Sequence, residues 1–216
     1  MRGGVEWLFQ GQHIRAYLVH GWQDDVVVTF NHWRAGRAGF DPVASESWIT
    51  ARGLGHMRIQ TAANDWYLNP DLAAAQAALR DARKRIPRTR LFGMSMGGSG
   101  ALLFGAALQA DAALLISPSL PRKMQDATVL QQAAKGPRYT FLYDPKIAVD
   151  VWSVTVLSDL FPGSSLVSLH GGGHPATGTI HRAGRFNLVR DVATGAAPDV
   201  TAIIHAHNRI AHRPHL

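Results

Sequence analysis

Short apolar runs, separated by turn residues, recur along the chain. Val26–Phe30 is apolar or β-branched at every position, which is typical of a strand that is covered on both faces. Gly11 separates the first two runs and predicts a hairpin there. We expect eight strands, at Val5–Gln10, Ile14–His20, Val26–Phe30, Met57–Thr61, Arg90–Met94, Ala112–Ile116, Tyr139–Tyr143 and Ser165–His170.

Segments between the later runs have the spacing of helices. The clearest follows Asn69-Pro70-Asp71, a typical helix start, and ends before Pro87. Its apolar face is formed by Leu72, Ala75, Leu79, Ala82 and Ile86. Gly98–Leu108 and Val151–Phe161 are further candidates. This alternation of strands and helices predicts a single α/β domain over residues 1–216, with a mostly parallel sheet.

The composition excludes several classes of protein. Of the 216 residues, 46% are hydrophobic and 17% are charged, so the chain is neither disordered nor a coiled coil. It has no cysteine, which excludes a disulfide framework, a thiolate zinc site and a cysteine nucleophile. No apolar stretch has the length of a signal peptide or a membrane span. We therefore expect a cytoplasmic protein that does not contact membranes.

The most informative motif is Gly-x-Ser-x-Gly, formed by Gly93, Ser95 and Gly97. A serine at a sharp turn from strand to helix presents its hydroxyl in a strained backbone conformation, and side chains two residues away on either side would clash. Glycine removes that clash. An apolar strand precedes the motif and a helix rich in Gly and Ala follows it. Ser95 is therefore predicted to be a nucleophile.

With its motif Gly-Met-Ser-Met-Gly-Gly, the chain resembles the α/β-hydrolase superfamily from the Val5 hairpin to about Arg185. The resemblance implies the α/β-hydrolase fold, a mostly parallel eight-stranded sheet with helices on both faces. Because the connection Ser117–Arg138 is short, we expect little or no lid. The resemblance also implies a catalytic triad in the chain order serine, acid, histidine, and an oxyanion hole between two loops.

The histidine of such a triad should follow the last strand. The strand ending at His170 runs into three glycines that let the loop fold back, with His174 at its tip. We assign His174 as the general base that takes the proton of Ser95 and delivers it to the leaving group. His170 is the alternative.

The acid should follow the preceding strand, Tyr139–Tyr143. Asp144, which stands before Pro145, is assigned as the group that orients His174. Asp150, six residues further on, is the alternative. An aspartate before proline is also common in turns, so Asp144 has a structural interpretation as well.

One donor of the oxyanion hole should be the backbone amide of Met96, directly after the nucleophile. The second should come from the loop after Val26–Phe30. Many members of the superfamily carry His-Gly there, but this chain has Asn31-His32, so either of these amides is a candidate.

Several aromatic residues lie in the loops that follow the strands. In this fold those loops surround the active site. Trp33, Trp66 and Tyr67 are therefore expected to form a substrate-binding wall, together with Trp48. Core packing is the alternative for each of them.

The formal net charge of +7 raises the question of a polyanion as partner. Six cations lie between Arg80 and Arg90, at the start of the strand whose other end carries Ser95. We expect a solvated basic face away from the site, and no nucleic-acid partner. A His-rich stretch from about residue 200 contains His205, His207, His212 and His215. An exposed tail is expected there, rather than a zinc or nickel site.

Together these features predict a serine hydrolase of the esterase or acyl hydrolase type. It would cleave a carboxylic ester or related acyl bond through an acyl-Ser95 intermediate, with no metal or organic cofactor. The substrate would be a small molecule or an acyl ester attached to a polymer. Two alternatives are a catalytically inactive binding protein of the same fold, motivated by the missing His-Gly, and a polyanion-binding module. The acyl group, the alcohol and the oligomeric state are left open.

Overall fold

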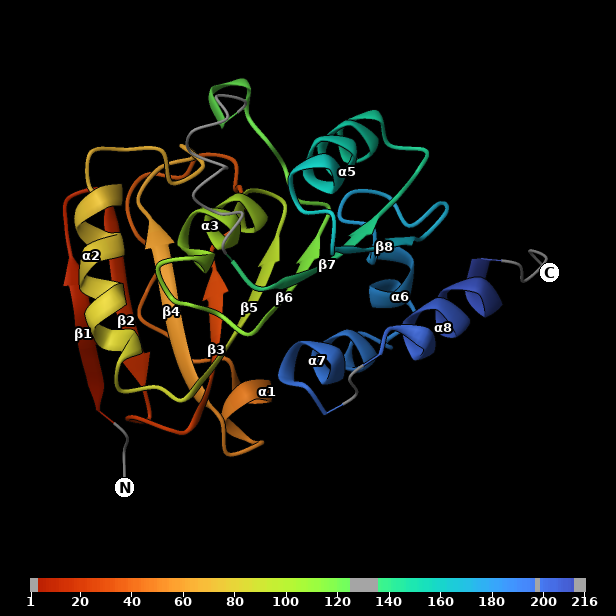
Figure 1. The fold of residues 1–216 in the computed structure, drawn as a ribbon. Helices are drawn as coiled ribbons and strands as arrows, with labels where there is room; N and C mark the ends of the chain where they lie inside the picture. Colours follow the sequence, from red (N-terminus) through yellow and green to blue (C-terminus); the bar gives the residue numbers. More distant parts are fainter. Residues whose placement is uncertain (1–3, 125–135, 197–198, 212–216) are drawn as a thin grey trace.

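A computed structural model describes residues 4–124, 136–196 and 199–211. Its centre is an eight-stranded sheet, in which β1 and β2 are antiparallel to their neighbours and all other pairs are parallel (Figure 1). The prediction of a mostly parallel eight-stranded sheet is confirmed. In spatial order the strands are β1 (Val5–Gln10), β2 (Ile14–Val19), β4 (Gly55–Thr61), β3 (Asp25–Phe30), β5 (Arg88–Met94), β6 (Ala112–Ile116), β7 (Arg138–Tyr143) and β8 (Ser165–Ser168).

Helices cover both faces of this sheet (Figure 1). One face packs against α2 (Leu72–Arg83), α3 (Met96–Gly105) and α5 (Ala148–Leu160), next to the short 3₁₀ helix η1 (Arg122–Met124). The other face packs against α1 (Ser47–Thr50), α6 (Gly178–Arg182), α7 (Asn187–Thr194) and α8 (Thr201–Ala211). Within β3, Val26 and Val28 belong to the first core and Val27 to the second, which explains why this strand is apolar throughout.

Helix α2 begins slightly later than the sequence suggests. Asp71 occupies the N-cap position of α2, but its side chain makes no hydrogen bond within the helix. Its carboxylate instead accepts hydrogen bonds from the backbone amides of His13 and Ile14, in the turn between β1 and β2. Asp71 therefore attaches the start of α2 to the hairpin at the edge of the sheet.

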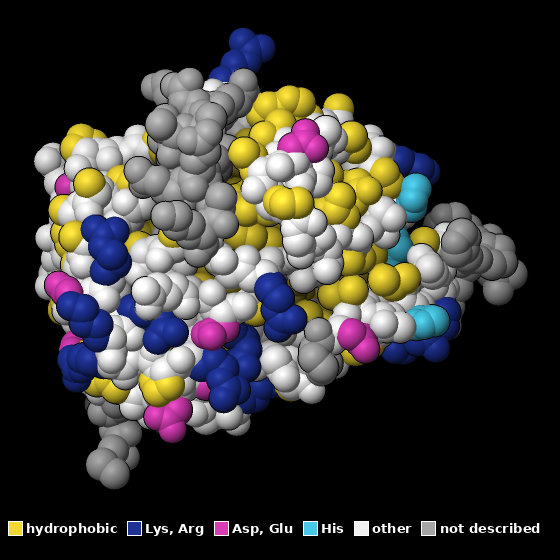
Figure 2. All heavy atoms as spheres, viewed as in Figure 1, with side chains coloured by type: hydrophobic (Ala, Val, Ile, Leu, Met, Phe, Trp, Pro, Cys, Tyr) yellow, Lys and Arg dark blue, Asp and Glu magenta, His cyan; other side chains and the backbone are white. Residues whose placement is uncertain are grey.

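The basic segment from Arg80 to Arg90 lies at the amino end of β5, whereas Ser95 follows the carboxyl end of the same strand. Lys and Arg side chains gather there among acidic ones, at the lower left of Figure 2. The ion pairs are Arg83–Asp111, Lys84–Asp81, Arg85–Glu6, Arg88–Asp25 and Arg90–Asp25. Acidic partners thus offset much of the charge of this segment, which lies on the rim of the sheet away from Ser95.

The His-rich stretch is not an exposed tail over residues 201–211, and that expectation is corrected. These residues form α8, which buries Ile203 in the second core and also buries Ala206. His207 is also buried, and its Nε2 lies 3.0 Å from the carbonyl oxygen of His170. His212 and His215 lie outside the described residues, as do residues 125–135 in the connection where little or no lid is expected. None of the described helices is long and apolar enough to cross a bilayer.

Candidate active site

Ser95 lies in the sharp turn between β5 and α3, with φ 50° and ψ −122°. This strained conformation directs the serine out of the regular path of strand and helix. The turn is so tight that a Cβ on Gly93 would lie 2.5 Å from the carbonyl oxygen of Gly97. The structure therefore has the steric requirement that the Gly-x-Ser-x-Gly motif predicts.

His174 lies beside Ser95, with its Nε2 3.0 Å from the serine Oγ. The histidine comes from the loop between β8 and α6. This loop folds back closely, because a Cβ on Gly172 would lie 1.7 Å from the carbonyl oxygen of Ala176. The alternative histidine, His170, is exposed, and its described contact is through its backbone carbonyl to His207.

The carboxylate that meets His174 belongs to Asp150, and the assignment of Asp144 to this place is corrected. Oδ1 of Asp150 lies 2.7 Å from Nδ1 of His174. Asp150 is in the first turn of α5 and its side chain is fully buried. Its second oxygen, Oδ2, accepts hydrogen bonds from the hydroxyl of Ser117 at 2.5 Å and the amide of Asp144 at 3.1 Å. Both oxygens of this carboxylate are therefore engaged.

Asp144 has a different part in the same region. Its carboxylate accepts hydrogen bonds from the amides of Lys146 at 2.9 Å, Gly171 at 3.2 Å and Gly173 at 2.8 Å. Burial alone would raise the pKa of Asp144, but the amides of Gly173, Lys146 and Gly171 lower it. Asp144 thus holds the glycine loop that carries His174, while α5 brings Asp150 to the imidazole.

These contacts determine which nitrogen of His174 carries the proton when the imidazole is neutral. Asp150 faces Nδ1 as an acceptor, so Nδ1 is the protonated nitrogen. Nε2 is then free to accept a hydrogen bond from the hydroxyl of Ser95. In this arrangement His174 is oriented to take the proton of Ser95.

Two backbone amides near Ser95 have no described hydrogen-bond acceptor within the residues that the structure covers. One belongs to Met96, the first residue of α3, and the other to His32, in the loop after β3. The two segments are adjacent, because a Cβ on Gly97 would lie 3.2 Å from the carbonyl oxygen of Phe30 and 3.3 Å from that of Asn31. Both amides were expected from the sequence as oxyanion-hole donors.

Asn31, the other expected donor, anchors the loop with its side chain. Its Nδ2 donates to the carbonyl of Thr61 at 2.9 Å, and its Oδ1 accepts from the amide of Thr61 at 3.0 Å. The hydroxyl of Tyr67 donates to the carbonyl of Asn31 at 3.1 Å. The end of β3 is therefore tied to the end of β4, and His32 follows this fixed point.

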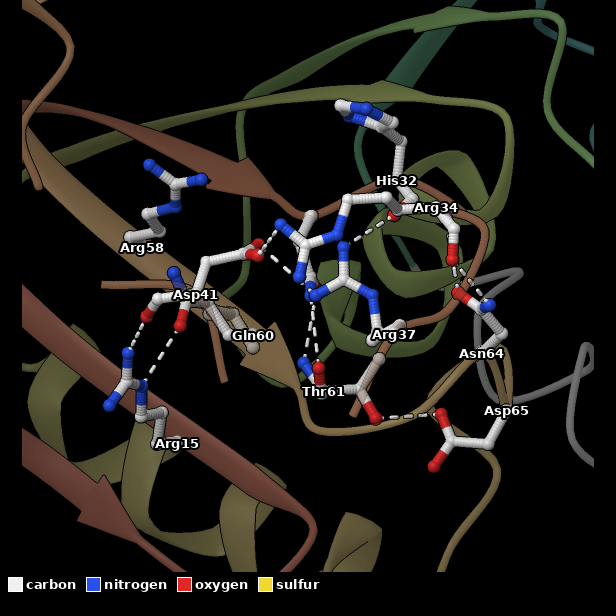
Figure 3. Close-up of polar contacts among 12 residues, drawn as sticks. Arg15, His32, Arg34, Arg37, Asp41, Arg58, Gln60, Thr61, Asn64 and Asp65 are labelled. Carbon is white, nitrogen blue, oxygen red and sulfur yellow. Dashed lines mark hydrogen bonds and ion pairs between the residues drawn. The ribbon is translucent and has the colours of Figure 1, made fainter. Parts of the chain in front are cut away.

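A buried ion pair, which sequence reasoning missed, supports the same loop (Figure 3). The guanidinium of Arg37, with a side chain that is 2% exposed, lies 3.1 Å from Asp41 and donates to the carbonyl of His32 at 2.9 Å. Burial opposes ionisation of Asp41, but Arg37, Arg34 and Arg58 lower its pKa overall. Burial and the charge of Arg37 lower the pKa of His32. The loop has no periodic pattern, so the sequence offered no signal for this pair.

A cavity of about 580 Å³ opens beside His174, and we call it the His174 cavity. This volume falls in the range of small-molecule sites, about 300–1,000 Å³. Its lining residues come from the ends of β3–β5, the segment around α1, the glycine loop, α6 and α7. They are Thr29, Phe30, His32, Glu46, Trp48, Arg58, Phe92, Met94, Gly172, Gly173, His174, Pro175, Thr177, Gly178, His181, Arg182, Phe186 and Arg190.

The aromatic residues expected to form a substrate wall are mostly elsewhere. Tyr67 is fully buried in the core, where it packs against Phe30 and Phe104. Trp33 is exposed, and the indole of Trp66 donates to Ser119 at 3.3 Å. None of the three lines the His174 cavity, whereas Trp48 does. Residue type and loop position alone did not distinguish aromatic residues that pack in the core from those that line the cavity.

In the described part of the chain, no three His, Asp or Glu side chains are grouped as metal ligands.

Comparisons with models of protein families and with curated proteins give no match. Solved structures do match. The capsule O-acetyltransferase of Neisseria meningitidis serogroup A has a TM-score of 0.54 at 12% identity, covering 85% of this chain and 93% of that chain. Dienelactone hydrolase from Anabaena variabilis has a TM-score of 0.53 at 14% identity, covering 90% and 97%. An acetyl xylan esterase from Paenibacillus sp. R4 has a TM-score of 0.52 at 14% identity, covering 82% and 78%. With its sheet order and helical layers, the chain has the α/β-hydrolase fold.

Proposed function

We propose that the protein is a serine hydrolase that cleaves carboxylic esters or related acyl bonds through an acyl-Ser95 intermediate. The observation that carries the proposal is the chain of contacts from Ser95 Oγ to His174 Nε2 at 3.0 Å and from His174 Nδ1 to Asp150 Oδ1 at 2.7 Å. Nucleophile, base and orienting acid are then arranged in the order that acyl transfer requires. Further support comes from the names of structural neighbours, which include an esterase, a lactone hydrolase and an acetyltransferase.

In the first half-reaction, Ser95 Oγ attacks the carbonyl carbon of the ester while its proton moves to Nε2 of His174. The carbonyl oxygen becomes an oxyanion, which the amides of Met96 and His32 stabilise by hydrogen bonds. As the carbon–oxygen bond to the leaving group breaks, Nε2 gives the proton to the departing alcohol. The product that remains is the acyl ester of Ser95.

In the second half-reaction, water attacks the acyl carbon and gives a proton to Nε2 of His174. The bond to Ser95 Oγ then breaks, and His174 returns the proton to the serine. The carboxylic acid leaves and the enzyme is restored. Asp150 accepts the hydrogen bond of Nδ1 throughout and stabilises the imidazolium that forms in each half.

The proposal is tested with 4-nitrophenyl acetate and a fluorophosphonate probe. The wild type should release 4-nitrophenol and become covalently labelled, and Ser95→Ala should do neither while unfolding at the same denaturant concentration. Ser99→Ala is the matched control, because Ser99 lies in α3 and its hydroxyl donates to the backbone of Ser119. A folded wild-type protein that neither turns over the ester nor reacts with the probe would instead support the inactive binding protein.

A further inference from the structure

The wall of the His174 cavity has a surplus of positive charge. Three guanidinium groups line it, from Arg58, Arg182 and Arg190, and Glu46 supplies the carboxylate. Arg58 lies 3.7 Å from Glu46. Across the described ranges, neither Arg182 nor Arg190 has a carboxylate within 4.0 Å. Two of the three cations are therefore without an acidic partner in the protein as described.

This arrangement differs from the basic segment at the far rim of the sheet. There, Arg83, Lys84, Arg85 and both β5 arginines are each within 4.0 Å of an acidic side chain. Cations on a solvated face with acidic partners have a structural explanation. Arg190 differs from them, because it is half-buried at a cavity beside His174 and has no described carboxylate within 4.0 Å.

The cavity also has buried hydrogen-bond donors without acceptors. Nε of Arg58 and Nε of Arg190 are both buried, and neither has a hydrogen-bond partner among the described residues. The Arg190 guanidinium lies 5.8 Å from the ring centroid of Trp48 and 5.5 Å from that of Phe186. These rings restrict the Arg190 side chain before any ligand binds. Arg190 therefore loses less side-chain entropy on binding than an unrestrained arginine would. Because both Nε atoms are closed to solvent, an anion in the cavity would meet the terminal nitrogens of these guanidinium groups.

The position of the cavity indicates which part of an ester it would receive. His174 is itself a lining residue, and so is Met94, the residue before Ser95. In the proposed mechanism Nε2 of His174 protonates the leaving-group oxygen, so the leaving group must lie against His174. A leaving group that extends from this point enters the cavity and approaches the arginines.

We propose that the His174 cavity binds an anionic group, a carboxylate or a phosphate, on the alcohol portion of the substrate. The proposal rests on the serine hydrolase function proposed above and specifies its substrate class. Arg190 and Arg182 bind the anion through charged, directional hydrogen bonds, for which the planar guanidinium is well suited. Neutral esters of the same shape are poorer substrates because they leave these cations unpaired.

The test compares 4-acetoxybenzoate with 4-acetoxybenzamide, which has the same shape and acyl group but no charge, and follows product release by chromatography. The wild type should have the higher kcat/KM for 4-acetoxybenzoate. In Arg190→Gln and in Arg182→Gln the ratio of the two kcat/KM values should fall about tenfold or more. Taking the ratio removes the intrinsic difference in reactivity between the esters. Arg80→Gln, in α2 on the far rim, is the matched control and should leave the ratio unchanged.

Phenyl phosphate and 4-hydroxybenzoate, tested as competitive inhibitors, distinguish the two kinds of anion. The compound that inhibits more strongly shows whether the cavity prefers a phosphate or a carboxylate. It should inhibit Arg190→Gln more weakly than the wild type. Arg190→Lys keeps the charge but loses the planar guanidinium. The inhibitor should bind it more weakly than the wild type and more strongly than Arg190→Gln. Denaturant unfolding of each variant shows whether it remains folded, and Arg182 is exposed enough for its replacement to leave the core intact.

The outcomes separate the two proposals. Equal turnover of both esters, or a ratio that is the same in the arginine variants as in the wild type, overturns the anionic substrate class and leaves the hydrolase standing. If the wild type turns over no ester, binding of 4-hydroxybenzoate and phenyl phosphate is measured by calorimetry. Arg190-dependent binding without turnover overturns the hydrolase but supports the anion site, and absence of binding overturns the anion site as well.

Discussion

Oδ1 of Asp150 lies 2.7 Å from Nδ1 of His174, and Oδ2 of the same carboxylate accepts hydrogen bonds from the chain around it. The imidazole is therefore oriented by an acid that is itself fixed on both sides. Asp144, only six residues earlier, supports the loop of His174 through backbone amides. Replacing each aspartate separately should therefore have different effects on catalysis and on stability.

Asp150→Asn should reduce kcat for 4-nitrophenyl acetate by about 10³–10⁴-fold, because an amide at this position favours the wrong tautomer of His174. Asp144→Asn should reduce kcat by less than about tenfold, but lower the free energy of unfolding by about 1–3 kcal/mol through weakened hydrogen bonds to the loop amides. Steady-state kinetics and denaturant unfolding measure both effects. The reverse ranking in kcat would return the role of the acid to Asp144.

Ser117 connects the acid to the histidine loop. Its hydroxyl donates to Oδ2 of Asp150 and accepts a hydrogen bond from the amide of Ala176 at 2.9 Å. Ser117→Ala leaves that buried amide without its acceptor, so the free energy of unfolding should fall by about 1–3 kcal/mol, and kcat should fall with little change in KM. Because Ser117 has φ 45°, Ser117→Gly relieves backbone strain and should be more stable than Ser117→Ala, while kcat stays equally low. Full kcat in both variants would show that the network does not position Asp150.

The Arg37–Asp41 pair offers a test of the loop that carries the His32 amide. Arg37→Gln leaves Asp41 with the largely exposed Arg34 as its ion-pair partner, so the free energy of unfolding should fall by about 1–3 kcal/mol. The carbonyl of His32 also loses its donor, so kcat should fall more than KM rises. Arg34→Gln is the matched control, because Arg34 lies 2.9 Å from the same Asp41 but is 54% exposed, and its loss should cost less than about 1 kcal/mol. An equal loss in free energy of unfolding in the two variants would show that burial of Arg37 does not strengthen its interaction with Asp41.

The sequence predicted the features that depend on local sterics or on burial over several residues. All eight strands were found because turn residues separate short runs rich in apolar and β-branched residues, and Ser95 was found because Gly93 and Gly97 are required by the turn around it. The choice between Asp144 and Asp150 depended on where α5 begins relative to the glycine loop. That relation joins two segments far apart in the chain, so no local pattern contained it.

Features missed by the sequence analysis have a similar cause. Arg37 and Asp41 lie in an irregular loop, where a charged residue is normally solvated, and here it is the packing of the loop on β2 and β4 that buries the pair. The sequence analysis missed helix α8 because its many histidines were interpreted as an exposed tail. Its buried residues Ile203, Ala206 and His207 nevertheless have the spacing of one helical face. Arginines of the His174 cavity come from β4, α6 and α7, and only the folded chain brings them together.

His56 gives a prediction for the dependence of stability on pH. Its ring is buried, with Nε2 2.8 Å from the hydroxyl of Thr29 and Nδ1 3.2 Å from the amide of Glu46, which donates to it. Burial, with a smaller effect of Arg58, lowers the pKa of His56 from 6.5 to about 3. Between pH 6.5 and about 3, the imidazole of His56 is therefore protonated in the unfolded chain but stays neutral in the folded protein.

The free energy of unfolding should consequently decrease as the pH falls from 6.5 toward 3, with a contribution from His56 of at most about 1.4 kcal/mol per pH unit. His56→Gln removes this contribution. It should be less stable than the wild type at pH 7, because it loses a fitted ring, and the difference should shrink as the pH falls. Urea unfolding of both proteins at pH 7, 6 and 5 measures the difference directly, and other titrating groups largely cancel. If the two curves run parallel, His56 becomes protonated in the folded state without penalty, and the buried neutral ring inferred from its contacts is wrong.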